Sequence, residues 1–540
     1  MPSISALSRT RPENIKHILD DIEDQFHLDE AALKTITSQY LSDVNLGLGD
    51  PTFVTGVPDG TETGTFLALD LGGTNLRVCQ VELHGDKTFS LRQQKYRVSE
   101  ALKTGEATVL FDYLADSVDA FLTSSPPASP TNPPVPGELY EDPPALPLGL
   151  TFSFPVEQTA LDQGYLLTWT KGFAAKNAIG KDVVKLLQDA FDRKHLHVQC
   201  VAIVNDTVGA LLSRAYTAGG CTLGCIFGTG TNGAYVEKVA NITKLKNNPV
   251  VAKGGVMIVN TEWGAFNNTR TTLPTTPFDN KLDRESINPR YQAFEKFVSG
   301  MYLGEVTRNI LLSLIDASPK PILFGGIASK LMNTHYGFDT EFMSLVEGAW
   351  ESEIHLNGNS ASAGPELPDS EKSTTKDVKP IDDDALLDFS VPLVAASLSS
   401  HTLHRLQRVR TVLVSKLGYE PAQVTLRDAA VVHWACAIVA RRAARMSGCV
   451  VAASVKQMGY VPEPGSGVQT KDEGRISVGV DGSLIEHYPR FQDHLRESLR
   501  LLVGEQVEQR VEIGMAKDGS GVGAALCALV ATKLKKSGSS

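Results

Sequence analysis

The chain has 540 residues, which is too long for one ordinary hydrophobic core, so two lobes are expected. Its 51 basic and 62 acidic residues give a formal net charge of −11 and form no concentrated basic patch, which argues against nucleic acid or an anionic membrane as the main partner. No apolar run approaches about 18 residues and the N-terminus lacks a secretory signal's apolar core, so we expect a cytoplasmic protein. Seven cysteines without a Cys-x-x-Cys pair predict small buried thiols in place of a zinc site.

The N-terminal part of the chain predicts helices followed by a hairpin. Helical periodicity covers residues 12–28 and 30–42, and a Gly/Pro/Thr-rich connector occupies 46–64. An apolar strand over 66–71 then enters the turn Gly72-Gly73-Thr74-Asn75, and a second strand follows. Turns of this composition let a backbone approach an anion closely and direct N–H groups at it.

Asp70 ends the first strand of this hairpin. A carboxylate at that place is suited to hold Mg²⁺ through water, because this ion keeps most of its hydration shell. The alternative is a turn carboxylate that satisfies its own backbone.

Two loops and several alternating elements occupy the rest of the chain. Residues 123–147 carry nine prolines and predict an exposed loop, and residues 351–384 predict a polar surface insertion. Strands and helices alternate throughout, which indicates an α/β fold. The expected strands are 148–155, 255–266 and 476–483, and the expected helices are 180–194, 291–315, 391–417, 426–447 and 523–534.

The stretch 201–237 contains the strongest chemical signal. An apolar strand ends at Asn205-Asp206, a helix follows, and a second strand runs into the turn Gly228-Thr229-Gly230. This turn repeats the composition of the first hairpin, which suggests a duplicated α/β unit. A base and a phosphate-binding turn on adjoining strand ends suit phosphoryl transfer, and the chain has no P-loop motif. The alternatives are a helix N-cap for Asp206 and an ordinary hairpin turn.

A further group of polar residues beside apolar elements suits a ligand with several hydroxyls. Each buried hydroxyl needs a partner, because an unmatched one costs about 1–3 kcal/mol. Taken singly, each member could instead be a surface or capping residue, and Lys171 could be a snorkelling lysine. The group consists of Ser153, Thr170, Lys171, Asn205, Asp206, Asn232, Glu262 and Glu295.

These stretches together resemble the eukaryotic hexokinase/glucokinase family, and the fungal glucokinases in particular. The matching segments keep the family's order from position 66 to 534. They are LDLGGTNLRV (69–78), LGLTFSFPVEQTALDQGYLLTWTKGF (148–173), VNDTVG (204–209), FGTGTNGAYVE (227–237), NTEWGAF (260–266), FEKFVSGMYLGE (294–305), VGVDGS (478–483) and DGSG (518–521).

The resemblance implies an actin-like (ribonuclease H-like) fold in which two lobes close over a deep cleft. It also implies transfer of the γ-phosphoryl group of Mg-ATP to a hexose 6-hydroxyl, the first step of glycolysis. The expected division is an N-terminal part, a small lobe, a large lobe and a C-terminal helix that returns to the small lobe. These parts span 1–65, 66–204, 205–517 and 518–540.

The resemblance also implies roles for single residues. Asp206 would be the general base, Lys171 would steady the charge of the moving phosphoryl group, and Asp70 would position the metal through water. The sugar would be bound by Ser153, Thr170, Lys171, Asn205, Asp206, Asn232, Glu262 and Glu295. The nucleotide and its phosphates would be bound by Asp70, Gly72, Gly73, Thr74, Asn75, Arg77, Gly228, Thr229, Gly230, Thr340, Ser344, Gly482 and Ser483. Met301 departs from relatives with a lysine there and receives no role.

Two other functions are compatible with parts of this pattern. One is a sugar-sensing regulator of the same family with weak or no kinase activity, which would be marked by loss of the base, the lysine or a phosphate turn. The other is a different actin-like ATPase, which would lack the sugar-binding group. The expected partners are a hexose and ATP, with neither nucleic acid nor membrane, in a monomer or weak homodimer.

Overall fold

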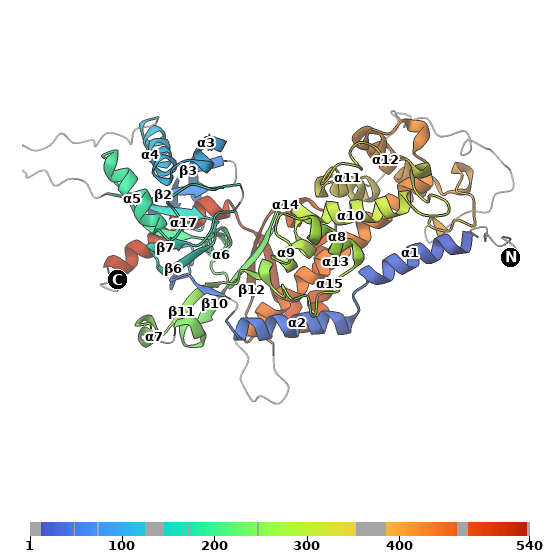
Figure 1. The fold of residues 1–540 in the computed structure, drawn as a ribbon. Helices are drawn as coiled ribbons and strands as arrows, with labels where there is room; N and C mark the ends of the chain where they lie inside the picture. Colours follow the sequence, from blue (N-terminus) through green and yellow to red (C-terminus); the bar gives the residue numbers. More distant parts are fainter. Residues whose placement is uncertain are drawn as a thin grey trace, which may run out of the picture.

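The structure is a computed structural model that describes residues 12–47, 49–72, 75–124, 145–170, 172–245, 248–352, 385–461 and 474–536. Most of the predicted proline-rich loop and most of the predicted polar insertion lie outside these residues. Two β-sheets organise the described chain, each with its own helices (Figure 1).

The smaller lobe is built on a five-stranded sheet with the order β4-β3-β2-β5-β8. Strands β2, β3 and β4 form an antiparallel meander, and β5 and β8 add in parallel beside β2. The bounds are β2 (Thr63–Leu71), β3 (Asn75–His84), β4 (Phe89–Arg97), β5 (Leu146–Phe152) and β8 (Val198–Val204), with the helices α3 (Glu100–Thr104), α4 (Ala107–Thr123) and α5 (Val183–Arg193) and the hairpin β6 (Val156–Ala160) and β7 (Gln163–Leu166).

The larger lobe repeats this order in its own sheet, β11-β10-β9-β12-β13, with the short strand β1 added at the β11 edge. Again a three-stranded antiparallel meander is extended by two parallel strands. The predicted duplicated α/β unit is therefore visible in the strand order. The bounds are β1 (Asp50–Pro51), β9 (Leu223–Phe227), β10 (Thr231–Lys238), β11 (Val256–Asn260), β12 (Ile476–Asp481) and β13 (Val511–Met515).

Helices cover the large sheet, and two N-terminal helices join them (Figure 1). The buried residues of α1 and α2 belong to the same hydrophobic core as those of the large lobe. The helices are α1 (Pro12–Phe26), α2 (Glu30–Asn45), α7 (Val250–Lys253), α8 (Pro277–Glu285), α9 (Ala293–Val298), α10 (Gly300–Ile315), α11 (Thr340–Glu351), α12 (Ser400–Leu417), α13 (Leu426–Gln457), α14 (Ser483–His487), α15 (Phe491–Val503) and α16 (Glu505–Glu508).

A separate hydrophobic core lies where the lobes meet. Helices α6 (Asp206–Ala218) and α17 (Gly519–Lys536) pack on each other, α17 against the inner face of the small sheet and α6 against the large sheet. Gly209 and Gly523 allow this contact, because a Cβ on Gly523 would lie 2.2 Å from the Gly209 Cα atom. The opposite face of β2 packs beneath α4 and α5, so β2 is covered on both sides and its apolar residues run almost without interruption.

Most predicted elements form, and two helix predictions need correction. The helix expected over 391–417 begins only at Ser400, where the Ser399 hydroxyl caps it by accepting a 3.0 Å hydrogen bond from Thr402 N–H. The helix expected over 291–315 is broken at Ser299 into α9 and α10.

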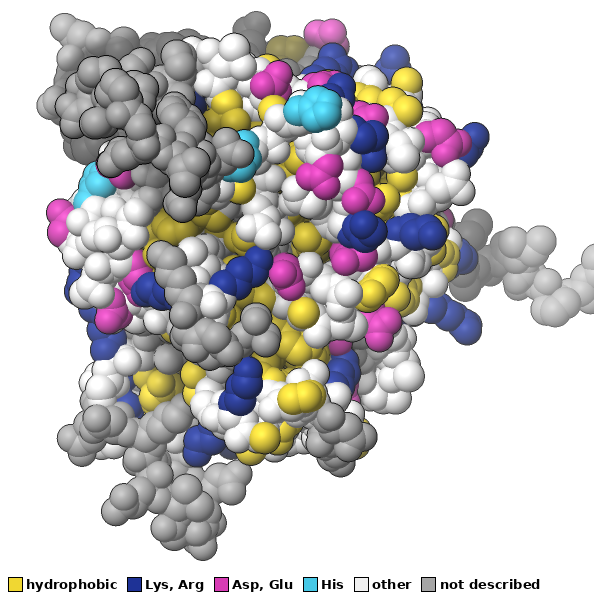
Figure 2. Space-filling view, turned by 90° about the vertical axis from the view of Figure 1, so that its left-hand side faces the viewer, with side chains coloured by type: hydrophobic (Ala, Val, Ile, Leu, Met, Phe, Trp, Pro, Cys, Tyr) yellow, Lys and Arg dark blue, Asp and Glu magenta, His cyan; other side chains and the backbone are white. Residues whose placement is uncertain are grey.

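All seven cysteines are buried and free, as predicted. Among the described helices, none combines the length and the apolarity needed to cross a lipid bilayer. On the end of the molecule seen in Figure 2, the described Lys, Arg, Asp and Glu side chains are interspersed, with no large area of a single sign.

Candidate active site

The junction of β8 and α6 presents two predicted site residues. Asn205 caps α6, because its Oδ1 accepts a 2.8 Å hydrogen bond from Thr207 N–H. Asp206 occupies the first helical position, where it is half-buried and accepts a 3.2 Å hydrogen bond from the Thr207 hydroxyl. The capping role that competed with catalysis therefore belongs to Asn205, and the Asp206 carboxylate retains lone pairs that can accept a proton.

The turn between β9 and β10 is held closed by backbone hydrogen bonds. Gly228 N–H donates to the Gly230 carbonyl at 3.0 Å. The start of α10 docks on the same turn, where Gly300 N–H donates to the Gly228 carbonyl at 2.7 Å and Met301 N–H donates to the Thr229 carbonyl at 3.1 Å. The protein's own backbone hydrogen bonds therefore fix the shape of this turn.

Beside this turn, two amides and a carboxylate form one hydrogen-bonded cluster. The Glu262 Oε1 atom accepts from Asn260 Nδ2 at 2.6 Å and from Asn232 Nδ2 at 3.2 Å, and Asn232 Nδ2 also lies 2.8 Å from Asn260 Oδ1. Burial raises the pKa of the Glu262 carboxyl, the amide hydrogen bonds lower it, and the charge of Asp206 raises it. The last effect places Asp206 and Glu262 in one electrostatic environment. Such a set of donors and acceptors suits a polyhydroxyl ligand.

Glu295 reaches the same region from the first turn of α9. Its Oε2 atom accepts a 3.1 Å hydrogen bond from Thr231 N–H, directly after the β9–β10 turn. Thr231 is itself fixed, because its hydroxyl accepts a 2.9 Å hydrogen bond from the buried Trp263 indole. The two glutamates predicted to bind the sugar are thus attached to the two ends of one short stretch, 231–232.

The small lobe contributes the predicted residues Ser153 and Thr170. Ser153 follows β5 and is half-buried, whereas Thr170 is exposed and Lys171 lies outside the described residues. Trp169 supports this segment by stacking on Phe173 with ring centroids 5.5 Å apart. An aromatic cluster therefore backs the small-lobe residues, while the amide–carboxylate cluster belongs to the large lobe.

The turn between β2 and β3 is the small lobe's phosphate-binding candidate. Gly72 N–H donates to the Asn75 carbonyl at 3.0 Å, which closes the turn. The predicted residues Gly73 and Thr74 lie outside the described residues.

Directly below this turn, Asp70 and Arg77 face each other across the strands. Arg77 Nη2 and Nε donate to Asp70 Oδ2 at 2.8 and 3.0 Å. Arg77 Nη1 also lies 3.1 Å from Asp518 Oδ1. Burial lowers the pKa of the Arg77 guanidinium, but the two carboxylates outweigh it and the net shift is upward. Arg77 thus meets two carboxylates, and Asp70 is oriented by a two-point hydrogen bond.

A cavity of about 440 Å³ opens beside the β9–β10 turn on the large lobe. Four predicted nucleotide-binding residues line it, namely Thr229, Thr340, Ser344 and Ser483. The Thr340 hydroxyl accepts a 2.9 Å hydrogen bond from Gly304 N–H, and the Ser344 hydroxyl donates to the His487 carbonyl at 3.3 Å. Met301 also lines the cavity and is 43% exposed, so this wall is apolar where a lysine would be charged.

Gly482 packs directly against the end of β9 and the start of the β9–β10 turn. Its backbone has φ 115°, and a Cβ there would lie 2.5 Å from the Phe227 carbonyl oxygen and 2.7 Å from Gly228 N. A side chain is therefore excluded on both conformational and steric grounds.

Three polar residues of this region were not predicted as site residues. Asn260 orients Glu262, and Asp518 binds Arg77, as described above. For Asp481, burial raises the pKa, the Gly482 N–H lowers it, and the charges of Asp206 and Asp518 raise it again. All three lie inside the family-like stretches NTEWGAF, VGVDGS and DGSG, which was the signal available in the sequence.

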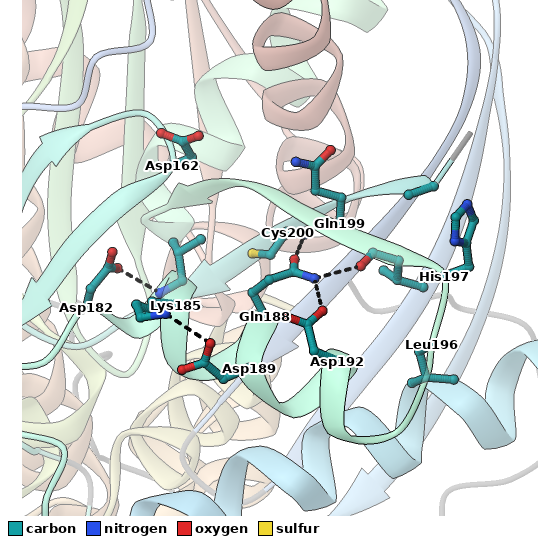
Figure 3. Close-up of a pocket in the computed structure, with 13 residues that line it drawn as sticks. Asp162, Asp182, Lys185, Gln188, Asp189, Asp192, Leu196, His197, Gln199 and Cys200 are labelled. Carbon is teal, nitrogen blue, oxygen red and sulfur yellow. Dashed lines mark hydrogen bonds and ion pairs between the residues drawn. The ribbon is translucent and has the colours of Figure 1, made fainter. Parts of the chain in front are cut away.

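A second hollow, of about 560 Å³, lies between α5 and β8 on the small lobe (Figure 3). Gln188 covers the free edge of β8 there, donating to the Val198 carbonyl at 3.2 Å and accepting from Cys200 N–H at 2.9 Å. This amide takes the place of a neighbouring strand. None of the predicted site residues lines the hollow, whose acidic side chains are Asp162, Asp182, Asp189 and Asp192.

The comparisons with known proteins match hexokinases or glucokinases. Two sequence profiles, both described as hexokinase, match residues 18–216 and residues 222–381 with 387–530. The chain is 37% identical to a glucokinase of Aspergillus niger over 94% of this chain and 96% of the relative. It is 34% identical to glucokinase-1 of Saccharomyces cerevisiae over 98% of this chain and 100% of the relative.

A solved structure agrees with these relatives. The hexokinase of Schistosoma mansoni, determined in complex with glucose, superposes with a TM-score of 0.72 at 30% sequence identity. The match covers 97% of this chain and 100% of that one.

Proposed function

The chain belongs to the hexokinase family and has the actin-like fold of that family, and from this premise we propose the reaction of its cleft. Hexokinases phosphorylate hexoses with ATP. We propose that this chain transfers the γ-phosphoryl group of Mg-ATP to the 6-hydroxyl of glucose. The observation that carries the proposal is Asp206, a half-buried carboxylate at the junction of β8 and α6, where Asn205 takes the capping role.

The sugar is bound mainly from the large lobe. Glu262 and Asn232 belong to one hydrogen-bonded cluster, and Glu295 adjoins it through Thr231. These groups offer paired acceptors and donors to adjacent hydroxyls, whereas Ser153 and Thr170 approach from the small lobe. The glucose complex of the S. mansoni hexokinase supports glucose as the ligand.

Asp206 acts as the general base and accepts the proton of the attacking hydroxyl, a contribution of about 10²–10⁴-fold in rate. Lys171 steadies the charge that moves with the phosphoryl group. The two glycine/threonine turns align the phosphates, and alignment with charge stabilisation supplies most of the catalysis in a loose transition state. Closure of the lobes on the sugar excludes water, which is the competing acceptor.

We propose that a divalent cation binds among the carboxylates of this region. Burial and the charges of Asp206 and Asp518 raise the pKa of Asp481, and a cation bound nearby would relieve this repulsion. Asp70 would hold Mg²⁺ through water, and the ion would neutralise charge on the donor's phosphates.

The test measures initial rates with glucose, fructose and mannose, each with Mg-ATP, together with the identity of the product. We expect hexose 6-phosphate and ADP in equal amounts, with glucose among the substrates that react. Glucose binding without turnover would contradict the proposal and would indicate a sugar-sensing regulator. ATP hydrolysis that no sugar stimulates would contradict it in favour of a different actin-like ATPase.

A further inference from the structure

The segment 516–520 consists of the connection from β13 to α17 and the first two residues of α17, and its first part is attached to the large lobe. Ala516 N–H donates to the Val480 carbonyl at 2.8 Å, which extends the pairing of β13 with β12 by one residue. The next carbonyl, that of Lys517, accepts a 2.7 Å hydrogen bond from the Ser213 hydroxyl on α6.

The second part of this segment is attached to the small lobe. The Ser520 carbonyl accepts a 2.7 Å hydrogen bond from the Thr151 hydroxyl of β5. The Ser520 hydroxyl accepts from the Arg77 guanidinium, which also pairs with Asp518. The attachments of this segment thus change from the large lobe at Ala516 and Lys517 to the small lobe at Asp518 and Ser520.

Asp518 is the residue at which the attachment changes lobe. Its backbone has φ 48°, the left-handed region that a non-glycine residue adopts only at some cost. Its Oδ1 atom accepts a 3.2 Å hydrogen bond from Gly521 N–H and lies 3.1 Å from Arg77 Nη1. The side chains of Arg77, Asp70 and Asp518 are 21%, 15% and 15% exposed, so these charges are partly shielded from solvent.

We propose that Asp518 is a positioning residue for the phosphate-donor side of the cleft. It holds the guanidinium of Arg77 from the side opposite Asp70, and so fixes the direction in which the Asp70 carboxylate points. The same contact ties the β2–β3 hairpin to the segment that joins the lobes. The proposal rests on the proposed function, because only in that function does Asp70 hold the hydrated metal ion.

A double-mutant cycle separates this role from simple helix capping. Asp518→Asn keeps the shape of the side chain and its acceptor for Gly521 N–H but loses the charge. We expect the KM for ATP to rise about tenfold, with the KM for glucose changed less than about twofold. In an Arg77→Met background, adding Asp518→Asn should change the KM for ATP less than about twofold, because the partner is already gone.

The matched control is Asp112→Asn on the outer face of the small lobe. Asp112 also receives two hydrogen bonds from one arginine, Arg193, at 2.6 and 3.0 Å, and its substitution should leave both KM values unchanged. Effects of Asp518→Asn and Arg77→Met that multiply independently would overturn the proposal, as would a KM for ATP that does not move in Asp518→Asn.

Hydrogen exchange of the ligand-free chain gives a readout that does not need activity. Arg77→Met should accelerate exchange of the amides at 519–522, although they lie more than 400 positions away in sequence. Unchanged exchange there would contradict the tie between hairpin and segment. If the wild-type chain phosphorylated no hexose, the proposed function would fail on that result alone, while the exchange measurement would still decide the tie.

Discussion

The β2–β3 and β9–β10 hairpins occupy equivalent places in two sheets of the same strand order, yet different forces stabilise them. The β9–β10 turn rests on packing. Phe227, the last residue of β9, is buried and stacks on Trp263 with ring centroids 5.9 Å apart. The Trp263 indole in turn fixes Thr231 at the start of β10.

The β2–β3 turn adds charge to its packing. The pair next to the turn, Leu71 with Leu76, is buried, whereas the following cross-strand pair is Asp70 with Arg77, and Arg77 is shared with Asp518 from a distant part of the chain. Aromatic rings lie beneath the β9–β10 turn, whereas an ion-pair network lies beneath the β2–β3 turn. The Arg77 side chain at the centre of that network is 21% exposed.

We therefore expect the two turns to respond differently to ligands and to salt. A turn backed by close packing has one arrangement, because interiors tolerate little displacement. A turn backed by carboxylates and a guanidinium can exchange partners with a charged ligand, and its strength depends on ionic strength. We therefore expect substitutions in the two hairpins to differ in kind.

The largest effect should come from Asp206→Asn, at the start of the helix that packs between the two sheets. We expect kcat to fall by about 10²–10⁴-fold, because the proton acceptor is removed while the shape is kept. Glucose binding, followed by intrinsic fluorescence, should persist in part. Asp493→Asn is the control, since Asp493 also lies in a first helical turn, and it should retain full activity. Near-normal turnover of Asp206→Asn would refute the base assignment.

The packed hairpin is best tested with Gly482→Ala. The added Cβ would meet the Phe227 carbonyl at 2.5 Å, so we expect a loss of about 2–3 kcal/mol in the free energy of unfolding, with a higher KM for ATP. Gly459→Ala is the matched control, because Gly459 has φ 81° with no atom within 4 Å of the place that an added methyl group would take, and it reports the cost of the backbone alone. Equal losses in the two variants would show that close packing contributes nothing.

Glu262→Gln tests the sugar side of the same hairpin. We expect the KM for glucose to rise about 5- to 150-fold, because a charged acceptor of hydroxyls is lost. Glu237→Gln alters another buried, amide-bonded glutamate on β10 and should leave that KM unchanged. An unchanged KM in Glu262→Gln would remove Glu262 from the sugar site.

Glu262→Gln also tests how the free energy of unfolding depends on pH. Burial raises the pKa of Glu262 in the folded chain, so from about pH 4 upward the folded state binds more protons than the unfolded state. The free energy of unfolding that this residue contributes therefore falls as pH rises through that window. Denaturant unfolding should show Glu262→Gln gaining stability relative to wild type between about pH 4 and about pH 7. A relative loss over that range would contradict the raised pKa.

The smallest expected effect is that of Arg77→Met on stability, and its dependence on salt distinguishes the two hairpins most directly. Arg77→Met should cost about 1 kcal/mol of stability at low salt, and the cost should shrink between about 0.05 M and about 0.5 M NaCl as screening grows. The deficit of Gly482→Ala should not change over the same range. A salt-independent Arg77→Met deficit would mean that the aliphatic part of Arg77, and not its charge, supports the turn.

The sequence was informative wherever the signal is local. The two hairpins, the strand before Asp206 and the long buried α13 follow from apolar periodicity and turn composition, which neighbouring residues set among themselves. Family-like stretches predicted site roles for Asp206, Glu262 and Glu295, and the variants above test those roles. The prediction for 391–399 was wrong because the same apolar spacing occurs in a packed irregular segment.

Only the tertiary structure decided which of these residues act on one another. Nothing in the spacing of the chain indicates that Arg77 meets Asp518, that Asn260 orients Glu262, or that Asn205 and not Asp206 caps α6. Strand and turn preferences are set within a few residues, so the order of letters determined the two glycine/threonine hairpins and the acid between them. Ion pairs and ring contacts join residues that folding brings together from remote positions, so only packing decided that one hairpin carries an ion-pair network and the other carries aromatic rings.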